Sequence, residues 1–294
     1  VGLPGYRAAL ADIDIALAAD PEFALAHAFR GLVLINIVGL GQDWGLLNES
    51  IAAAKKAISL LPQLRLAHAT IGRAHQFLLD FAAAEIAFAK AATLPPGTGR
   101  GIILEANYHS AMRRPARALA LADLAISLDP LNQVPVRNRA GILLDDRKVT
   151  AGLALIEGWD RANPDNPIYP RFRVRALLMA GRPREALAAA QASPVEAERL
   201  FGTAVAQAKL GNRAASDSAL AALQSGNPEG LRPYRLALIR AAQGEAELAL
   251  RALSLALERR DGGLSSLRVD ELFDPLRRDP RFMAIERQLG FPPA

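Results

Sequence analysis

The side chains best suited to chemistry in this chain are four histidines and a pair of adjacent aspartates. His68 and His75 are seven residues apart, so on one helix they share a face but lie about 10 Å apart, too far to hold one metal ion together. Asp145 and Asp146 fall at a predicted turn between helices, where capping and solvation explain acidic residues. We therefore predict neither a metal site nor a catalytic acid–base pair.

Short motifs that assemble a cofactor site or a nucleophile are also missing. The sequence contains no G-x-x-x-x-G-K-[ST], no G-x-G-x-x-G between a strand and a helix, no G-x-S-x-G and no H-E-x-x-H. The glycine-rich stretch Gly97–Gly101 follows Pro95 and Pro96, which is typical of a turn. Cysteine is absent, which excludes disulfides, thiolate metal sites and cysteine nucleophiles. We expect no catalytic residue, metal or cofactor, and an enzyme activity only from a separate domain.

The elements that position these residues are expected to be helices. Of the 294 residues 51% are hydrophobic, enough for a folded core, and only 5% are aromatic, while alanine, leucine and arginine are common. No run reaches the roughly 18 to 20 apolar residues that span a bilayer. The net charge of +5 is compatible with an acidic partner.

Prolines mark an internal period of 34 residues. Two series have this spacing: Pro62, Pro96, Pro130 and Pro164, and then Pro194 and Pro228. Because proline lacks an amide hydrogen and clashes with the preceding turn, it ends the second helix of each unit. With this period the chain resembles the tetratricopeptide-repeat (TPR) family, whose unit is a helix-turn-helix pair. The resemblance implies an all-α, right-handed superhelical solenoid.

Small residues fill the positions at which the two helices of a TPR unit approach each other. The glycine position of the motif is assigned to Gly31, Gly72, Ala106, Ala140, Val174, Gly202 and Ala237. The first alanine position is assigned to Ser50, Ala84, Ala118, Gly152, Ala186, Ala214 and Ala249, and the second to Ala16, Ala57, Ala91, Ala125, Ala221 and Ala256. Trp159 and Ser193 break the second series, and most large aromatic positions are unfilled. The resemblance thus depends on the period and the small residues.

The period predicts about seven helix pairs. Repeats are expected to begin near residues 24, 65, 99, 133, 167, 195 and 230, preceded by an opening half-repeat over 4–21, so that 1–262 form the solenoid and 263–294 a C-terminal capping segment. Seven extra residues at 39–45 predict a lengthened loop, and the 30-residue interval from Pro164 to Pro194 predicts a shortened second helix. Because the opening half-repeat lacks a first helix, we expect the parent solenoid to begin upstream.

The C-terminal residues leave the 34-residue pattern. Their apolar positions are suited to cover the exposed end of a repeat stack: Leu272, Phe273, Leu276, Phe282, Ile285 and Leu289. The run LFDPLRRDPRF over 272–282 resembles the end of TPR regions in bacterial signalling proteins, where the repeats follow an adenylate cyclase or a winged-helix DNA-binding domain. That resemblance implies a regulatory C-terminal region. We expect a cytoplasmic location, and the sequence leaves an extracytoplasmic one open.

In the TPR family the first helices line a concave face, and each has a stripe at i, i+3, i+7 and i+10 that points into it. These stripes carry six arginines and one glutamate. The predicted partner-binding residues on and beside them are Arg73, Gln76, Arg100, Asn107, Arg137, Asn138, Arg171, Arg175, Arg199 and Tyr234. Guanidinium groups bind carboxylates bidentately, which favours an acidic or C-terminal-carboxylate ligand. Solvated arginines on an arginine-rich surface are the alternative interpretation.

These observations predict a non-catalytic protein–protein interaction or scaffold module that binds a protein or peptide in the groove. One alternative is the TPR tail of a nucleotide cyclase. Another is a structural or self-associating solenoid of an envelope assembly, whose groove is blocked by its own chain or used for dimer contacts. Nucleic acid is not expected, because the aromatic residues needed for base stacking are scarce near the stripes.

Overall fold

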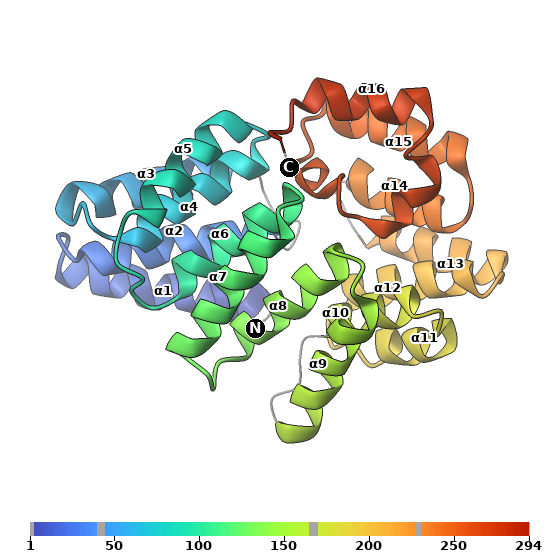
Figure 1. Ribbon diagram of the computed structural model, residues 1–294, viewed down its shortest axis with the longest axis horizontal. Coiled ribbons are helices and arrows are strands. Elements are labelled where there is room, and N and C mark those ends of the chain that lie inside the picture. The colour runs from blue at the N-terminus through green and yellow to red at the C-terminus, as the bar shows by residue number, and fades with distance from the viewer. Residues whose placement is uncertain (1–2, 40–44, 165–169, 227–230, 294) are drawn as a thin grey trace. The chain divides into compact units, whose positions relative to one another are not determined.

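The computed structural model describes residues 3–39, 45–164, 170–226 and 231–293, and these residues form α-helices, two 3-10 helices and turns, with no strand (Figure 1). The helix α1 (Leu3–Ala19) stands before the first pair. Seven pairs follow: α2 (Ala24–Gly39) with α3 (Leu46–Leu60), α4 (Arg65–Phe77) with α5 (Phe81–Ala92), α6 (Arg100–Ala111) with α7 (Pro115–Leu128), α8 (Gln133–Asp145) with α9 (Val149–Ala162), α10 (Pro170–Met179) with α11 (Pro183–Gln191), α12 (Glu196–Lys209) with α13 (Arg213–Ser225), and α14 (Pro233–Ala242) with α15 (Ala246–Glu258). The chain ends with the 3-10 helices η1 (Gly262–Ser266) and η2 (Glu271–Leu276) and with α16 (Pro280–Leu289).

The period of the sequence is therefore a period of helix pairs. From the second pair onward the first helices begin at residues 65, 100, 133, 170, 196 and 233, and the second helices of the first six pairs end a few residues before the prolines of the two series. Of the predicted lengthened loop at 39–45, residues 40–44 lie outside the described residues. The shortened second helix is confirmed, since α11 has 9 residues.

The turn inside each pair from the second onward contains one residue with a positive φ angle. These residues are Leu79, Arg113, Arg147, Gly181, Gly211 and Gly244. A left-handed residue just after a helix lets the following amides bond to the last carbonyls of that helix. The amide of Arg147 donates to Leu144 O at 2.9 Å, and that of Lys148 donates to Leu143 O at 2.8 Å. The positive-φ residue therefore identifies the register of each repeat independently of the sequence motif.

The turn residues correct the sequence register in one repeat. Gly211 lies 17 residues after Pro194, as Gly181 does after Pro164, so the sixth full repeat keeps the spacing of its neighbours. The motif positions assigned to Ala214 and Ala221 are exposed, whereas Ser216 and Leu223, two residues further on, are buried. By the same count Ala204, not Gly202, holds the glycine position. The register predicted from the motif is therefore two residues too early in this repeat.

The described contacts divide the chain into two compact units. The first unit comprises residues 1–109 and 120–130, and the second comprises 110–119 and 131–294. The first unit has a core cluster between α2, α3 and α4: Ile35, Val38, Leu47, Ala74 and Phe77. The predicted division into a solenoid over 1–262 and a capping segment falls inside the second unit and stays a prediction.

Close approach between paired helices is visible at Gly72 in the first unit. A β-carbon at Gly72 would lie 2.9 Å from ring atoms of Phe88 on the partner helix α5. Separations that short do not occur without movement of one group, so the aromatic ring packs directly on the backbone of α4. The glycine predicted at this position is therefore required by packing.

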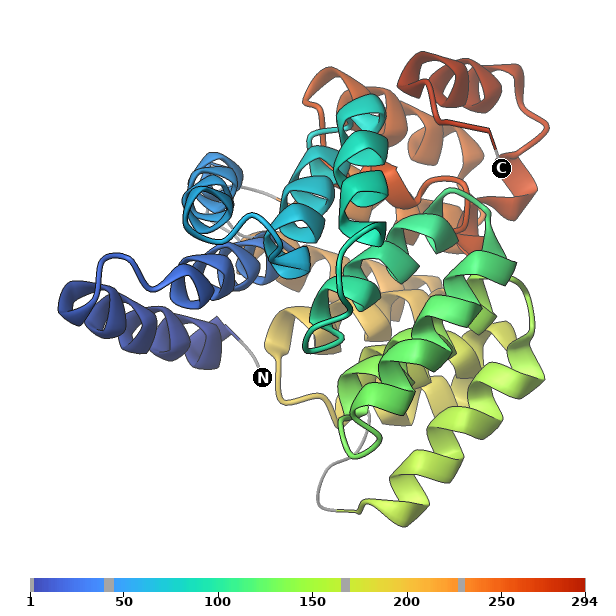
Figure 2. The same ribbon diagram turned by 60° about the vertical axis from the view of Figure 1, so that its left-hand side comes forward.

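In the second unit the first helices of successive pairs form a row, because α8 contacts α10, α10 contacts α12, and α12 contacts α14. The C-terminal elements complete this unit: η1 and η2 contact α14, and α16 contacts α15 (Figures 1 and 2). All six apolar residues predicted to cover the end of the stack are buried. The residues that precede α16 thus reach the side chains of the first helices.

Candidate partner-binding face of the second unit

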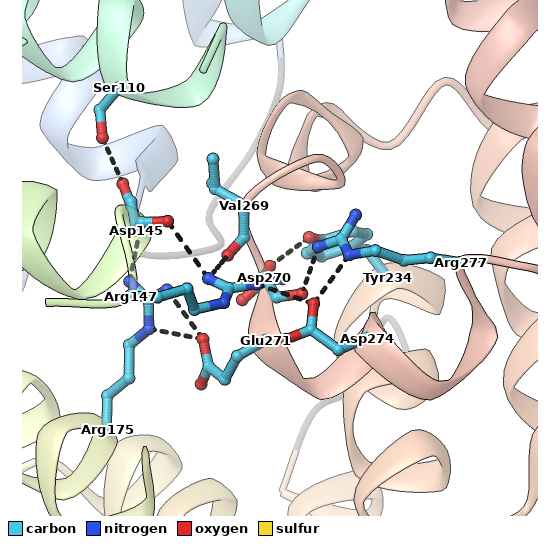
Figure 3. A network of polar contacts seen from close by, with 10 residues as sticks. All are labelled: Ser110, Asp145, Arg147, Arg175, Tyr234, Val269, Asp270, Glu271, Asp274 and Arg277. Atoms are coloured by element: carbon cyan, nitrogen blue, oxygen red, sulfur yellow. Dashed lines mark hydrogen bonds and ion pairs between the residues drawn. The ribbon is translucent and has the colours of Figure 1, made fainter. Parts of the chain in front are cut away.

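Arg175, on the first helix α10, lies at the centre of a polar network in the second unit (Figure 3). Its Nη1 donates to Asp145 Oδ1 at 2.8 Å, and its Nε donates to Glu271 Oε2 at 2.9 Å. Asp145 is the last residue of α8 and also accepts a hydrogen bond from Ser110 Oγ at 2.6 Å. Glu271 opens η2, 96 residues after Arg175. One guanidinium therefore joins two first helices to the C-terminal end of the chain.

The acidic partner of Arg175 belongs to a segment that we call the C-terminal segment, residues 262–277. Its apolar side chains hold it in place, since Leu264, Leu267 and Phe273 are fully buried. The ring of Phe273 makes an edge contact with Tyr234 at a centroid separation of 5.7 Å. Burial of such side chains contributes about 1.5 to 3 kcal/mol each. The segment is thus an integral part of the second unit.

Tyr234, in the first turn of α14, is the second predicted groove residue that contacts this segment. Its hydroxyl donates to Asp270 Oδ2, and its backbone amide donates to Asp261 Oδ2 at 3.1 Å. The side chain of Asp261 also bonds to Arg232 and to the amide of Gly263, which fixes the start of η1. The hydroxyl of Tyr234 therefore binds a carboxylate of the C-terminal segment, and its backbone amide binds a carboxylate of the turn before that segment.

Two further arginines bind the backbone of the C-terminal segment. Arg147 Nη1 donates to Val269 O at 2.8 Å and Nη2 donates to Asp274 Oδ1 at 2.7 Å. Arg277, inside the segment, donates to Asp270 O at 2.9 Å and to Asp274 Oδ1 at 2.7 Å. Side chain and main chain are thus recognised together, as a guanidinium fork allows.

The charges of this network shift the pKa values of its members. Burial would lower the pKa of Arg175, but Asp145, Glu271 and Asp270 raise it well above its ordinary value. Burial, and then the neighbouring charge of Glu271, raises the pKa of Asp270 to about 6. Burial opposes ionisation of Asp274, yet hydrogen bonds from Arg147 and Arg277 lower its pKa. Asp270 is therefore the carboxylate that takes up a proton most readily in mildly acidic solution.

The other predicted groove residues of the second unit have partners on or near their own helices. Arg171 is exposed, with its guanidinium 5.0 Å from the ring centroid of Phe172. Arg137 and Asn138 are half-buried on α8, where the amide of Asn138 donates to Val134 O at 2.6 Å. Arg199 lies 3.8 Å from Glu196. The corrected register places Phe201, two residues after Arg199, at the position equivalent to Arg171.

The remaining predicted residues belong to the first unit. Arg73 donates to Gln76 Oε1 at 2.8 Å and lies 4.3 Å from the ring centroid of Phe77. Arg100 is exposed, with its guanidinium 5.6 Å from the ring centroid of Phe29, and Asn107 is half-buried. These residues therefore offer one exposed and one half-buried guanidinium on the first helices α4 and α6.

Several residues of the network were missed because their roles depend on the fold. Arg147 lies in a hairpin turn, outside the stripe positions, and the C-terminal segment was interpreted only as an apolar cover. A partial signal is present in the sequence: Asp270, Glu271 and Asp274 place three acidic residues within five positions, next to a face predicted to be basic.

Two of the four histidines have local explanations. His27 and His68 occupy equivalent positions, and their Nε2 atoms lie 2.9 and 3.0 Å from the carbonyl oxygens of Pro21 and Pro62. Among the described residues, no group of three or more His, Cys, Asp or Glu side chains is arranged to hold a metal ion. The helices in the described ranges include none with the length and apolar character needed to cross a membrane.

Comparisons with known proteins identify the fold and no family. No family model matches the chain, and neither does any curated protein sequence. The solved structure of PilW, described as a widely conserved type IV pilus biogenesis factor, is similar at 20% identity and a TM-score of 0.50, covering 68% of this chain and 92% of that one. Yeast Tom70 is similar at 16% identity and a TM-score of 0.51, covering 96% of this chain and 62% of that one. At these identities the likeness concerns the fold alone, and with the helix pairs described above it shows that the chain has the all-α helical-repeat fold of TPR proteins.

Proposed function

We propose that this chain is a non-catalytic protein-interaction module whose first helices bind an acidic segment of a protein partner. Helical repeats of this type form extended binding surfaces. The observation that carries the proposal is the contact of Arg175 with Glu271: a first-helix arginine binds a carboxylate from a short turn of chain, at 2.8 Å. Arg147 adds a bond to a main-chain carbonyl of the same turn. The C-terminal segment thus provides a model, within the molecule, of the ligand class.

Exposed arginines on the other first helices would bind such a ligand from a partner. Arg100 and Arg171 meet this requirement best, because both are exposed and neither forms an ion pair among the described contacts. Within this proposal the chain acts as the regulatory C-terminal region of a bacterial signalling or transcriptional regulator. A nucleotide cyclase that carries the repeats as its tail is one form of the same arrangement.

A labelled, end-capped peptide of residues 269–275 (Val-Asp-Glu-Leu-Phe-Asp-Pro) is the probe that tests the proposal, with the Asn/Gln version of the peptide as its control. Arg171→Glu in the second unit is matched by Arg184→Glu, an exposed arginine on the second helix α11. Arg100→Glu in the first unit is matched by Arg7→Glu on α1.

Fluorescence anisotropy should show tighter binding of the acidic peptide than of its amide version, and weaker binding as salt increases. Each stripe variant should weaken binding on the order of fivefold, as expected for one exposed charge pair, and its matched control should not. Equal binding of both peptides, or equal loss in stripe and control variants, contradicts the proposal.

A structural solenoid is the second candidate, and one observation favours it. Glu271 of the C-terminal segment binds the guanidinium of Arg175, which supports a groove that is blocked by its own chain. Light scattering separates the two candidates: a tight dimer that the acidic peptide neither binds nor dissociates supports the structural role, whereas a species that binds the peptide supports the interaction module.

A further inference from the structure

The network around Arg175 contains more acidic than basic groups. Its carboxylates come from Asp145, Asp270, Glu271 and Asp274, and its guanidiniums come from Arg147, Arg175 and Arg277 (Figure 3). Four negative charges thus meet three positive charges, and one carboxylate is in excess. The neighbouring ion pair of Arg232 with Asp261 is balanced and does not change this count.

Asp270 is the carboxylate left without a guanidinium at its side chain. Asp145 and Glu271 accept hydrogen bonds from Arg175, and Asp274 accepts from Arg147 and Arg277. Among the contacts of the described residues, the side chain of Asp270 accepts a hydrogen bond from the hydroxyl of Tyr234 alone. The hydrogen in that bond belongs to Tyr234, so a proton taken up by the network binds an oxygen of the Asp270 carboxylate, to which no guanidinium donates.

The groups that face Asp270 come from four elements. Tyr234 lies on α14, Arg175 on α10 and Asp145 on α8. Glu271 follows Asp270 directly in the sequence and begins η2. Arg277 binds the main-chain carbonyl of Asp270, and Arg147 binds that of Val269. Burial opposes ionisation of Asp270 most, and the carboxylates of Glu271 and Asp145 oppose it further. Arg175 and the hydrogen bond from Tyr234 favour the ionised form, but the balance in the closed arrangement is against it.

We propose that the C-terminal segment closes over the first helices in a proton-dependent way: uptake of one proton by the carboxylates around Arg175 tightens the segment, and release of that proton loosens it. This inference deepens the proposed function, because segment and partner would use the same arginine. In mildly acidic solution the segment holds Arg175 more firmly, and at higher pH Arg175 becomes more available to an acidic ligand of another protein.

The direction follows from the contacts, because the side chain of Asp270 accepts from a neutral hydroxyl whereas the other three carboxylates accept from guanidinium groups. The pKa of Asp270 agrees with this, since burial and then Glu271 raise it to about 6. A carboxyl group with a pKa raised in the closed state stabilises that state below this pKa and loses the contribution as the pH rises through it. With an ordinary pKa near 3.8 in the open state, the closing equilibrium should increase about tenfold between pH 7.5 and pH 5.0.

Hydrogen exchange measured by mass spectrometry tests this. Protection factors, in which the intrinsic pH dependence of exchange is divided out, are measured for amides of residues 267–277 from pH 5.0 to 7.5. The wild-type chain should gain about tenfold in protection toward pH 5.0. Asp270→Asn should show no such gain, and Glu271→Gln should shift the gain to lower pH. Asp12→Asn, an exposed and unpaired position in the first unit, should behave as wild type.

Two results would overturn the inference: protection that does not depend on pH in the wild-type chain, or the same dependence in Asp270→Asn. The peptide titration remains a separate readout. If protection follows pH while the acidic peptide binds at neither pH 5.0 nor pH 7.5, the closure stands and the proposed function fails. If the peptide binds while protection does not change with pH, the proposed function stands and the proton-dependent closure fails.

Discussion

Repeat symmetry provides a matched pair of substitutions at Arg113 and Arg147. Both residues occupy the hairpin turn of their repeats, both belong to the second unit, and both have a φ of 60°. A residue with a side chain is strained there by roughly 1 to 2 kcal/mol relative to glycine. The two differ in what the side chain does: Arg113 is exposed and its guanidinium forms no hydrogen bond or ion pair with the described residues, whereas Arg147 binds Val269 and Asp274.

The expected changes have opposite signs. Arg113→Gly relieves the backbone strain and should stabilise the chain by about 0.5 to 1 kcal/mol, the remainder being lost to the larger entropy of unfolded glycine. Arg147→Gly gains the same amount but loses the two charge-assisted hydrogen bonds to the C-terminal segment, together with a longer local bond from Nη1 to Asp145 O at 3.2 Å. Since Arg147 is 37% and Asp274 44% exposed, each bond is worth about 1 kcal/mol rather than the value of a buried one. Arg147→Gly should therefore destabilise by about 1 kcal/mol.

Urea unfolding followed by circular dichroism measures this difference, which should be about 2 kcal/mol between the two variants at pH 7. The denaturant slopes should match that of the wild-type chain, so that midpoints report stability. If both substitutions stabilise equally, the bonds from Arg147 to the C-terminal segment contribute nothing, and the account of how the segment is held is wrong.

Three other substitutions test the packing and the charges. Gly72→Leu places side-chain atoms where Phe88 packs and should cost on the order of 1 to 3 kcal/mol by urea unfolding, so that a neutral result contradicts the repeat register. Phe273→Ala removes a fully buried ring and should cost about 3 to 5 kcal/mol, with the exchange protection of residues 262–277 lost first; unchanged protection there would mean that the ring does not anchor the segment. The pKa of Asp270 is about 6, so its contribution to stability is present at pH 5.0 and is lost as the pH rises through 6. Between pH 7.5 and pH 5.0 the free energy of unfolding of the wild-type chain should therefore rise by about 1.4 kcal/mol more than that of Asp270→Asn. The same pH dependence in both proteins contradicts this assignment.

The helix pairs were predictable because their determinants are local. The prolines end second helices, and small residues such as Gly72 and Ala84 lie where helices meet, so the period alone places each pair. The register failed in one repeat, where Gly202 suggested a glycine position that the backbone assigns to Ala204. In an alanine-rich chain, a single small residue is weak evidence for the position where two helices meet. The 17-residue interval from proline to turn is better evidence for the register, because it depends on the length of the whole first helix.

The candidate site was predictable only in part. The stripe rule identified Arg175 and Tyr234, which both contact the C-terminal segment. Their ligands were not predicted, because Glu271 and Asp270 follow Arg175 by more than 90 residues and no local pattern records that pairing. The predicted stripes contain more arginines than acidic residues. In the second unit, however, Glu271 of the same chain binds Arg175 and neutralises its charge.

A double-mutant cycle on Arg175 and Glu271 tests most directly whether the first helices recognise an acidic segment. Urea unfolding of Arg175→Met, Glu271→Gln and the double variant gives the coupling energy between the two side chains. The guanidinium and the carboxylate are 25% and 15% exposed and 2.8 Å apart, so we predict a coupling of about 1 to 2 kcal/mol that decreases in high salt. A coupling near zero would contradict the account, because it would mean that this face holds the acidic segment through apolar burial alone.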